Sequence, residues 1–508
     1  MNAAERLASS YEALCAHTRE TALLQSVQAL LEWDDRTQLP TAAGPYRAEQ
    51  AACLAGMVHR RQTAPEVGGW LDELAASPLV EDPHSDAGTV VRRLRREYEK
   101  KRRLPPTLVE QLARLSARGQ QVWAAARKAS DFGQFLPVLA ETVDLKRQEA
   151  AALGFATTPY DPLLDDYEPG TATTEVAAVL DSLVASLRPL LQAILASDRG
   201  PDGRLLARRY ALDAQREFGM AAARAIGFDF SAGRLDVTDH PFCTTLGPRD
   251  VRLTTRYRED DFGDAFFSIL HEAGHGLYEQ GLPAASFGLP LSLATSLGIH
   301  ESQSRLWENQ IGRSRSFWEG LFPAARAAFP EALRGVEFAA FYRDVNRVAP
   351  SLIRVDADEI TYNLHIGIRF ELERALLEDD LQPADLPAAW NAKYDAYLGV
   401  VPPDDAQGVL QDVHWSAGLF GYFPTYALGN LYAAQFYAQA AEDLGDLEGQ
   451  VRRGEFQPLL QWLRSRIHAH GSRYEARELV ERVTGRPLSE RPWIEQMTRK
   501  YADVYRLD

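Results

Sequence analysis

The sequence contains very little cysteine. Only Cys15, Cys53 and Cys243 occur in 508 residues, and they are far apart. This scarcity excludes a disulfide framework and a cluster of thiolate metal ligands. Any transition metal would therefore have to be held by imidazole and carboxylate groups, which the eleven histidines and 71 acidic residues can supply.

Long uninterrupted apolar runs are also missing. No stretch approaches the length of about 18 apolar residues that a membrane span needs. Near the N-terminus charged residues recur every few positions, and no apolar core of a signal peptide is visible. We therefore expect no membrane partner and no signal peptide, and a reducing cytoplasm is the expected location.

Positive charge is scarce relative to negative charge. The formal net charge is −16, which repels polyphosphate backbones. Only the segment 92–103 (RRLRREYEKKRR) is strongly basic, and Glu97 and Glu99 interrupt it. We interpret it as a solvated helix face with local ion pairs rather than a polyanion site, and we expect no nucleic-acid partner.

Most of the sequence shows the spacing of amphipathic helices, for example over 108–127, 175–196 and 360–378. The segment 234–257 differs, because Val, Thr and Phe are enriched and a Gly247-Pro248 turn separates two alternating runs. That pattern predicts a β-hairpin, whose edge strand could pair with an extended peptide. The length allows about three domain-sized units or one large body.

The strongest chemical signal lies in 266–281 (FFSILHEAGHGLYEQG). His271 and His275 are four residues apart, so on a helix both imidazoles point to one place on the same face. This H-E-x-x-H spacing is typical of zinc sites, and Glu272 lies one position round the helix, where it can reach a metal-bound water. Chance would produce the pattern about 0.02 times in such a chain. The apolar neighbours argue against two solvated surface histidines.

A catalytic zinc needs a third protein ligand and one open position. The segment 298–304 (GIHESQS) begins a second amphipathic helix and contains Glu301. Two histidines and one glutamate would leave a net charge of about +1, which favours an anionic transition state. Glu301 is therefore the predicted ligand, and His300 and Glu279 remain alternatives.

Further motifs follow in order along the chain, and with the H-E-x-x-H pattern they resemble those of the thermostable carboxypeptidase Taq family of metallocarboxypeptidases. The resemblance covers nearly the whole chain. The matching elements are H-P-F at 240–242, D-x-R-x-T at Asp250, Arg252 and Thr254, H-E-S-Q at 300–303, I-R-x-x-A-D at Ile353, Arg354, Ala357 and Asp358, and G-x-x-Q-D-x-H-W at Gly408, Gln411, Asp412, His414 and Trp415.

The resemblance implies a mainly α fold, a large helical body with a deep groove and a small antiparallel sheet beside the active site. It implies one catalytic unit over 1–508, in which residues 1–230 form a mostly helical half and residues 231–508 form the active-site half. It also implies a homodimer, Glu301 as the third ligand, Zn²⁺ as the usual metal and Co²⁺ as a possible replacement. The implied activity is removal of C-terminal amino acids from peptides, one at a time and with broad specificity, but with poor cleavage of C-terminal Pro.

A carboxypeptidase must recognise the free terminal carboxylate, which an arginine can hold with two parallel hydrogen bonds. Arg252 and Arg354 are the candidates for this contact. The alternative is a structural ion pair, Arg252 with Asp250 or Arg354 with Asp358. The predicted substrate-binding residues are His240, Asp250, Arg252, Thr254 and Arg354.

His414 and a nearby tyrosine are the predicted hydrogen-bond donors to the oxyanion of the tetrahedral intermediate. Tyr422 and Tyr426 are both candidates, and aromatic packing is the alternative for each. His365 is interpreted as a core residue. The histidines interpreted as surface or capping residues are His17, His59, His84, His468 and His470.

Together these residues predict metal-assisted peptide hydrolysis with Glu272 as the general base. One rival is a metalloendopeptidase or a dipeptide-releasing enzyme, which would still cleave a peptide whose C-terminus is an amide. The other is a helical binding protein with a structural or vestigial metal site, which would hydrolyse no peptide.

Overall fold

The computed structural model describes residues 2–507. They form two compact units, each built from three separate stretches of chain. Unit 1 contains the residues up to Arg102, Gly203–Val345 and Phe436–Arg486, and unit 2 contains Arg103–Asp202, Asn346–Gln435 and the residues from Pro487 onward. The predicted halves, residues 1–230 and 231–508, therefore each contribute to both units. That the whole chain forms one catalytic unit stays a prediction.

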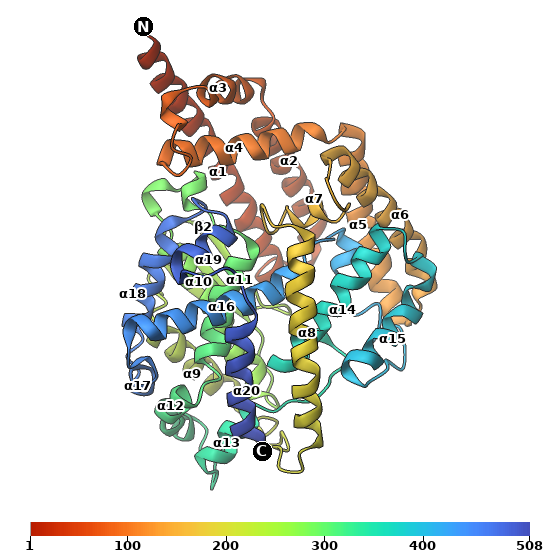
Figure 1. Cartoon of the computed structure of the whole chain (residues 1–508), viewed down its shortest axis with the longest axis vertical. Helices are drawn as coiled ribbons and strands as arrows, with labels where there is room; N and C mark the ends of the chain where they lie inside the picture. The colour runs from red at the N-terminus through yellow and green to blue at the C-terminus, as the bar shows by residue number, and fades with distance from the viewer. Residues whose placement is uncertain (1, 508) are drawn as a thin grey trace. The chain divides into compact units, whose positions relative to one another are not determined.

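Helices make up most of both units, which confirms the mainly α prediction (Figure 1). The helices of unit 1 are α1 (Ala3–Thr37), α2 (Gly44–Gln62), α3 (Pro65–Ala75), α4 (Asp86–Arg103), α9 (Leu212–Ala225), α10 (Phe262–Gly281), α11 (Leu297–Arg305), α12 (Arg315–Ala328), α13 (Phe338–Val345), α17 (Leu447–Arg452), α18 (Gln457–Arg466) and α19 (Ala476–Thr484). Those of unit 2 are α5 (Pro106–Ala129), α6 (Phe132–Leu153), α7 (Asp161–Leu164), α8 (Thr173–Ala196), α14 (Glu359–Leu377), α15 (Leu386–Leu398) and α20 (Arg491–Tyr505). Helix α16 (Pro424–Leu444) has residues in both units, and Arg103, the last residue of α4, belongs to unit 2.

The three helices expected at 108–127, 175–196 and 360–378 are α5, α8 and α14. Local chemistry explains where α5 and α14 begin. Pro106 is the first residue of α5, where its missing N–H costs no helical hydrogen bond. Asp358 caps α14, because its carboxylate accepts hydrogen bonds from the N–H groups of Ile360 and Thr361.

Helix α8 is long and apolar enough to cross a membrane, judged by length and composition alone. Its residues Leu180, Leu183, Leu187 and Leu191 are buried, and α8 packs beside α14 and α20 (Figure 1). This packing buries one face of α8 within unit 2, and about a third of its apolar stretch is buried. The absence of a membrane partner stays a prediction.

The predicted hairpin in 234–257 is present, with a third strand that the sequence pattern did not indicate. Strands β2 (Cys243–Gly247) and β3 (Asp250–Thr255) pair in antiparallel fashion, and β1 (Gly233–Val237) pairs with β3 in parallel, in the order β1-β3-β2. The sheet is thus mixed rather than antiparallel. Strand β2 lies at the edge, and its Leu246 carbonyl accepts a hydrogen bond from Ser26 of α1.

The basic segment lies in α4, and it is not simply a solvated helix face, because some of its arginines bond to the backbone of another part of unit 1. Arg93 is buried and donates hydrogen bonds to the carbonyls of Ser472 and Tyr474, and Arg92 donates to the carbonyl of Arg473. Arg95 and Glu99 form one of the expected pairs four residues apart within the segment. These arginines therefore fix the loop before α19 within unit 1, which favours a structural interpretation over a polyanion site.

Candidate metal centre

Helix α10 carries the H-E-x-x-H residues, and 12 of its 20 residues are buried while the others are half-buried. Asp261 caps it by accepting a hydrogen bond from the N–H of Asp264. Phe262 and Phe266 stack at 5.2 Å between ring centres and pack against Trp318. This apolar packing in unit 1 holds the helix, and so its polar residues, in a fixed position.

Three ligand-type side chains converge beside α10. The Nε2 atoms of His271 and His275 and a carboxylate oxygen of Glu301 all lie within 4.8 Å of one another. Glu301 Oε2 is 3.7 Å from Nε2 of His271 and 3.5 Å from Nε2 of His275. Ligands at about 2.0–2.2 Å from a tetrahedral Zn²⁺ are separated by about 3.3–3.6 Å. The donor set and its spacing therefore fit a divalent transition metal.

Burial and charge set the protonation of these groups. Burial lowers the pKa of His275 to about 3, so this imidazole is neutral and able to bind a cation. Burial alone would also lower the pKa of His271, but the Glu301 and Glu308 carboxylates outweigh it and raise that pKa. Burial raises the pKa of Glu301, yet Arg305 and His271 outweigh it and keep the carboxylate ionised.

Glu272 lies in the same buried environment, with 6% of its surface exposed. Burial raises its pKa to about 7, because the charged carboxylate loses its hydration. A carboxylate with a pKa near the working pH is suited to take up and release a proton. A bound cation would lower this pKa again, since an adjacent positive charge favours the ionised form.

Sequence reasoning missed Glu308, which contacts the ring nitrogen of His271 that does not face Glu301. Its Oε2 is 2.8 Å from Nδ1 of His271, and it also contacts Arg305 and Arg313. Glu308 lies in a π-helical turn, Leu306–Ile311, that follows α11. The spacing of Glu301, Arg305 and Glu308 at four and three residues could have indicated one charged helix face.

Helices α10 and α11 touch through their backbones beside the candidate ligands. A Cβ atom added at Gly274 would lie 2.6 Å from the carbonyl oxygen of Gln303 and from Cα of Ser304. Glycine at position 274 therefore allows α11 to approach closely enough to place Glu301 next to the two histidines.

We expect Gly274→Ala to push α11 away from α10. Overpacking of this kind costs about 1–3 kcal/mol of unfolding free energy, and the displacement of Glu301 should weaken metal binding as well. Urea unfolding and metal titration of the variant test this. The exposed Gly69, whose added Cβ would meet nothing within 4 Å, supplies the control Gly69→Ala. Equal effects at the two positions would contradict the close-approach argument.

The two alternative ligands, His300 and Glu279, bond to each other instead. His300 Nε2 lies 2.9 Å from Glu279 Oε1, and His300 Nδ1 lies 2.5 Å from Nδ1 of His275. Both ring nitrogens of His300 are therefore engaged away from the point where the three ligand-type atoms converge. The structure favours Glu301 as the third ligand.

The predicted substrate residues of the sheet are largely engaged with one another. Arg252 bonds Asp250 through Nε and Nη2 at 2.9 and 3.0 Å and lies 4.3 Å from the ring centre of Trp33. The structural ion pair considered for Arg252 is thus present. Thr254 is fully buried and exchanges hydrogen bonds with the backbone of Phe242 in the H-P-F motif, so it fixes that motif rather than facing solvent. His240 is exposed.

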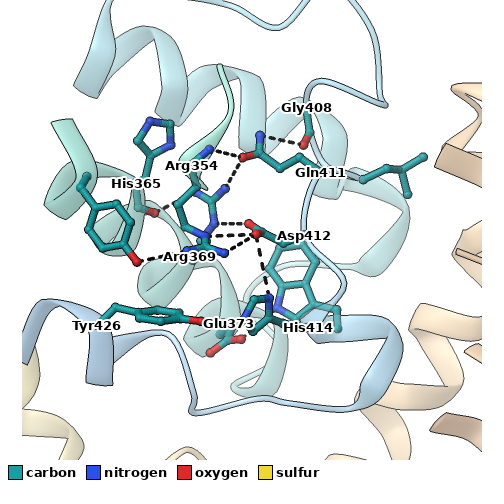
Figure 2. Close-up of polar contacts among 12 residues, drawn as sticks. Arg354, His365, Arg369, Glu373, Gly408, Gln411, Asp412, His414 and Tyr426 are labelled. Carbon is teal, nitrogen blue, oxygen red and sulfur yellow. Dashed lines mark hydrogen bonds and ion pairs between the residues drawn. The ribbon is translucent and has the colours of Figure 1, made fainter. Parts of the chain in front are cut away.

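In unit 2, Arg354 lies in a buried cluster around Asp412 (Figure 2). The Asp412 carboxylate accepts from Nε and Nη2 of Arg354 at 3.0 and 2.8 Å and from Nε of Arg369 at 2.7 Å. Asp358 caps α14 instead, so the predicted alternative pair of Arg354 with Asp358 is wrong. Gln411 also accepts from the N–H of Arg354 and from Nη2 of Arg369.

Sequence reasoning also missed Arg369, a fully buried arginine in α14. It shares one helix face with His365 and Glu373, four residues to each side. This spacing of polar and charged residues was the available signal. His365 is fully buried and its Nδ1 is 3.0 Å from the hydroxyl of Tyr394, as expected for a core residue.

His414 lies among aromatic rings of the same unit. Its ring centre is 4.4 Å from that of Phe423 and 5.3 Å from that of Tyr422, and its Nε2 is 3.3 Å from the hydroxyl of Tyr426. Burial lowers the pKa of His414 to about 3, so the ring is neutral and can donate one hydrogen bond. Both the polar contact and the aromatic packing weighed from the sequence are present, and the polar contact is with Tyr426.

His468 is not a surface residue, which corrects the sequence interpretation. It is fully buried, its Nε2 is 3.0 Å from Oε1 of Gln303, and its ring centre is 5.0 Å from that of Tyr278. Gly281 leaves room for it, since a Cβ there would lie 2.2 Å from Nδ1 of His468. A contact between residues so far apart in sequence had no local signal.

Burial lowers the pKa of His468 to about 3, so acid should destabilise the fold through this residue. Between the unfolded pKa of about 6.5 and the folded value, only the unfolded chain binds the proton, and stability falls as the pH falls. In this pH range one such histidine lowers the free energy of unfolding by up to about 1.4 kcal/mol for each pH unit. We expect His468→Gln to lack this contribution, so its stability should fall less steeply in acid. Urea midpoints at pH 7 and pH 5 measure it. An unchanged pH dependence would contradict the buried, neutral state.

Comparison with known proteins gives this arrangement a family. The model of the family described as carboxypeptidase Taq (M32) metallopeptidase matches residues 13–501. The chain belongs to that family. It is 50% identical over 507 residues to thermostable carboxypeptidase 1 of Thermus thermophilus, covering 98% of this chain and 99% of the relative. It is 39% identical to carboxypeptidase 1 of Bacillus subtilis, covering 94% of this chain and 95% of the relative.

Solved structures agree with the sequence comparison. The M32 carboxypeptidase from Deinococcus radiodurans matches with a TM-score of 0.95 and 42% identity over 98% of this chain and 99% of that one. The carboxypeptidase of Pyrococcus furiosus matches with a TM-score of 0.93 and 34% identity over 97% and 99%. The protein is therefore a carboxypeptidase, a hydrolase of peptide bonds, and its family implies a divalent metal. This confirms the family, fold class and enzyme class predicted from the sequence.

Proposed function

We propose that this carboxypeptidase removes C-terminal amino acids one at a time, with broad specificity, and that Zn²⁺ bound by His271, His275 and Glu301 is its usual cofactor. The main support for this proposal is that the Nε2 atoms of the two histidines and a carboxylate oxygen of Glu301 lie within 4.8 Å of one another, beside the buried Glu272. Co²⁺ accepts the same nitrogen and oxygen donors and could replace Zn²⁺. When bound, the cation would act as a Lewis acid toward water and the scissile carbonyl.

Glu272 would perform the proton transfers. Its carboxylate takes a proton from the attacking water and returns it to the leaving amine, so it is regenerated in each turnover. A pKa of about 7 without metal, lowered when the cation binds, keeps the carboxylate ionised at neutral pH. This is the protonation state that a general base needs.

The remaining predicted residues would recognise the substrate and the transition state. Arg354 or Arg252 would bind the terminal carboxylate, and a guanidinium fork suits that group. His240, Asp250 and Thr254 would support substrate binding at the sheet. His414, together with Tyr426 or Tyr422, would donate hydrogen bonds to the oxyanion.

A pair of test peptides that differ only at the C-terminus tests the proposed specificity. One peptide has a free C-terminal carboxylate and the other a C-terminal amide, and release of the last residue is measured by mass spectrometry. We expect the amide to lose most of the activity, since the arginine contact needs a carboxylate. Equal cleavage of both peptides would favour the endopeptidase alternative.

We further propose that the carboxypeptidase is a cytoplasmic homodimer acting on peptides, without nucleic-acid partners. The homodimer rests on the family resemblance, and the cytoplasmic location is the expectation drawn from the sequence. Sedimentation equilibrium of the purified protein tests the first of these. A mass of 56.6 kDa at micromolar concentration would contradict the dimer.

A further inference from the structure

The two histidines of the candidate metal centre have different partners on their second ring nitrogen. Nδ1 of His271 faces a carboxylate directly, Glu308 Oε2 at 2.8 Å. Nδ1 of His275 faces another imidazole, Nδ1 of His300, at 2.5 Å. A carboxylate is also connected to His275, but only through His300, whose Nε2 lies 2.9 Å from Glu279 Oε1.

The chain of contacts from His275 ends on strand β2. The other oxygen of Glu279 accepts a hydrogen bond of 2.8 Å from the Thr245 hydroxyl. Thr245 and Glu279 also line a cavity of about 770 Å³, where water can solvate the anionic end of the chain. Three elements of unit 1 are thereby linked, since His275 and Glu279 lie on α10, His300 on α11 and Thr245 on β2.

These contacts are consistent with one direction of hydrogen bonding throughout. If Nε2 of His275 is to bind a cation, the proton of this ring must be on Nδ1, which then donates to Nδ1 of His300. His300 must in turn carry its proton on Nε2, which donates to Glu279. The carboxylate accepts from His300 on one oxygen and from Thr245 on the other, so every contact has one donor and one acceptor.

We propose that His300, Glu279 and Thr245 form a positioning relay that fixes the tautomer and the ring orientation of His275 for metal binding. His300 thus acts behind a ligand and is not a ligand itself. The inference rests on the metal centre proposed above. Outer partners of this kind raise the basicity of a metal-binding imidazole and hold its ring in place, and their loss typically weakens metal binding about 10–100-fold.

The test measures metal affinity in variants of the full-length protein. The apparent dissociation constant for Zn²⁺ is measured by competition with a chelator, and the absorption spectrum of the Co²⁺-loaded protein reports ligand geometry. We expect His300→Leu to weaken Zn²⁺ binding about 10–100-fold and to change the Co²⁺ spectrum. His300→Gln should retain most of the affinity, since its amide oxygen can accept from His275 while its NH₂ group donates to Glu279.

Two milder variants test the outer members of the relay if His300→Leu does not fold. Thr245→Val removes one donor to Glu279 without changing the shape of the side chain, and Glu279→Gln removes the charge while keeping a hydrogen-bonding group. Both should weaken Zn²⁺ binding less than His300→Leu, with Thr245→Val the weaker effect. Unchanged affinity in both would overturn the relay.

His468→Gln is the matched control for a purely structural role. His468 is also a buried histidine packed against Tyr278, but it bonds Gln303 and no candidate ligand. The urea midpoint of the metal-free protein should fall in both His468→Gln and His300→Leu, whereas Zn²⁺ affinity should fall only in His300→Leu. Equal affinity losses, or no rescue by His300→Gln, would show that His300 is merely structural.

The same titration separates failure of the relay from failure of the metal centre. If the unmodified protein binds Zn²⁺ tightly and His300→Leu binds it equally well, the relay is wrong while the metal centre stands. If the unmodified protein binds no Zn²⁺ in this assay, the metal centre is wrong and the relay falls with it.

Discussion

Replacing Glu272 with Gln should lower kcat by about 10²–10⁴-fold while the purified variant keeps its metal. The amide has nearly the same shape as the carboxylate but cannot accept the proton of the attacking water. Because Glu272 is not among the three converging ligand-type side chains, metal content should stay unchanged. Steady-state kinetics on a free-carboxylate peptide, together with elemental analysis of the same sample, measure both quantities.

Glu272→Asp separates loss of the carboxylate from loss of its position. It keeps the charge but draws the carboxylate back by about one bond length, so its kcat should lie between those of the unmodified protein and Glu272→Gln. Substantial turnover by a metal-loaded Glu272→Gln variant would overturn the general-base assignment.

Replacing Asp412 with Ala should strongly destabilise unit 2. It would leave Arg354 and Arg369, which are 5% and 0% exposed, without the carboxylate that both of them contact. Uncompensated buried charge of this kind typically costs about 3–5 kcal/mol of unfolding free energy. The urea midpoint of the variant at pH 7 measures the loss.

Asp379→Asn is the control for Asp412→Ala, because asparagine removes the charge and tolerates the positive φ of 68° at this position. Asp379 contacts Arg147 at 2.9 Å within the same unit, but its carboxylate is exposed. Exposed ion pairs contribute little, so this variant should leave the midpoint nearly unchanged. Similar effects of the two substitutions would contradict the argument that burial makes Asp412 important.

The Asp412 pair also predicts the direction of a pH effect. Burial raises the pKa of Asp412, but Arg354 and Arg369 outweigh it and hold that pKa far below its ordinary value. The stabilisation is therefore fully present above the unfolded pKa of about 3.9 and is lost only as the pH falls below it. Asp412→Ala should consequently show a weaker loss of stability in acid than the unmodified protein.

The features of the molecule that follow from short-range patterns could be predicted. The spacing of His271 and His275 on one helix turn fixes their common direction, whatever else the chain does. In the same way, apolar periodicity located α5, α8 and α14, and the Gly247-Pro248 turn located the hairpin of β2 and β3. Order and spacing of the motifs were sufficient for the family.

The features that depend on long-range contacts could not be predicted. Strand β1 pairs in parallel with β3, although β2 lies between them in the sequence. No local pattern indicates such a pairing. The burial of His468 depends on the space at Gly281, which lies far away in the sequence. The partner of Arg354 is Asp412, 58 residues away, rather than the nearby Asp358.

The roles of His300 and Glu308 lie between these two cases. Both are near the predicted ligands in sequence, so the sequence placed them in the right region. Which nitrogen of which histidine each one contacts depends on how closely α10 and α11 approach at Gly274. A ligand and its outer partner are therefore hard to tell apart by residue type alone.

The most direct test of the proposed function is a time course of an unblocked peptide followed by mass spectrometry, with the protein stripped of metal by a chelator and then resupplied with one equivalent of Zn²⁺ per chain. We expect no cleavage by the stripped protein. After Zn²⁺ is returned, we expect a series of peptides shortened one residue at a time from the C-terminus. Cleavage at internal bonds, or a series that is unaffected by metal removal, would contradict a metal-dependent carboxypeptidase built on His271, His275 and Glu301.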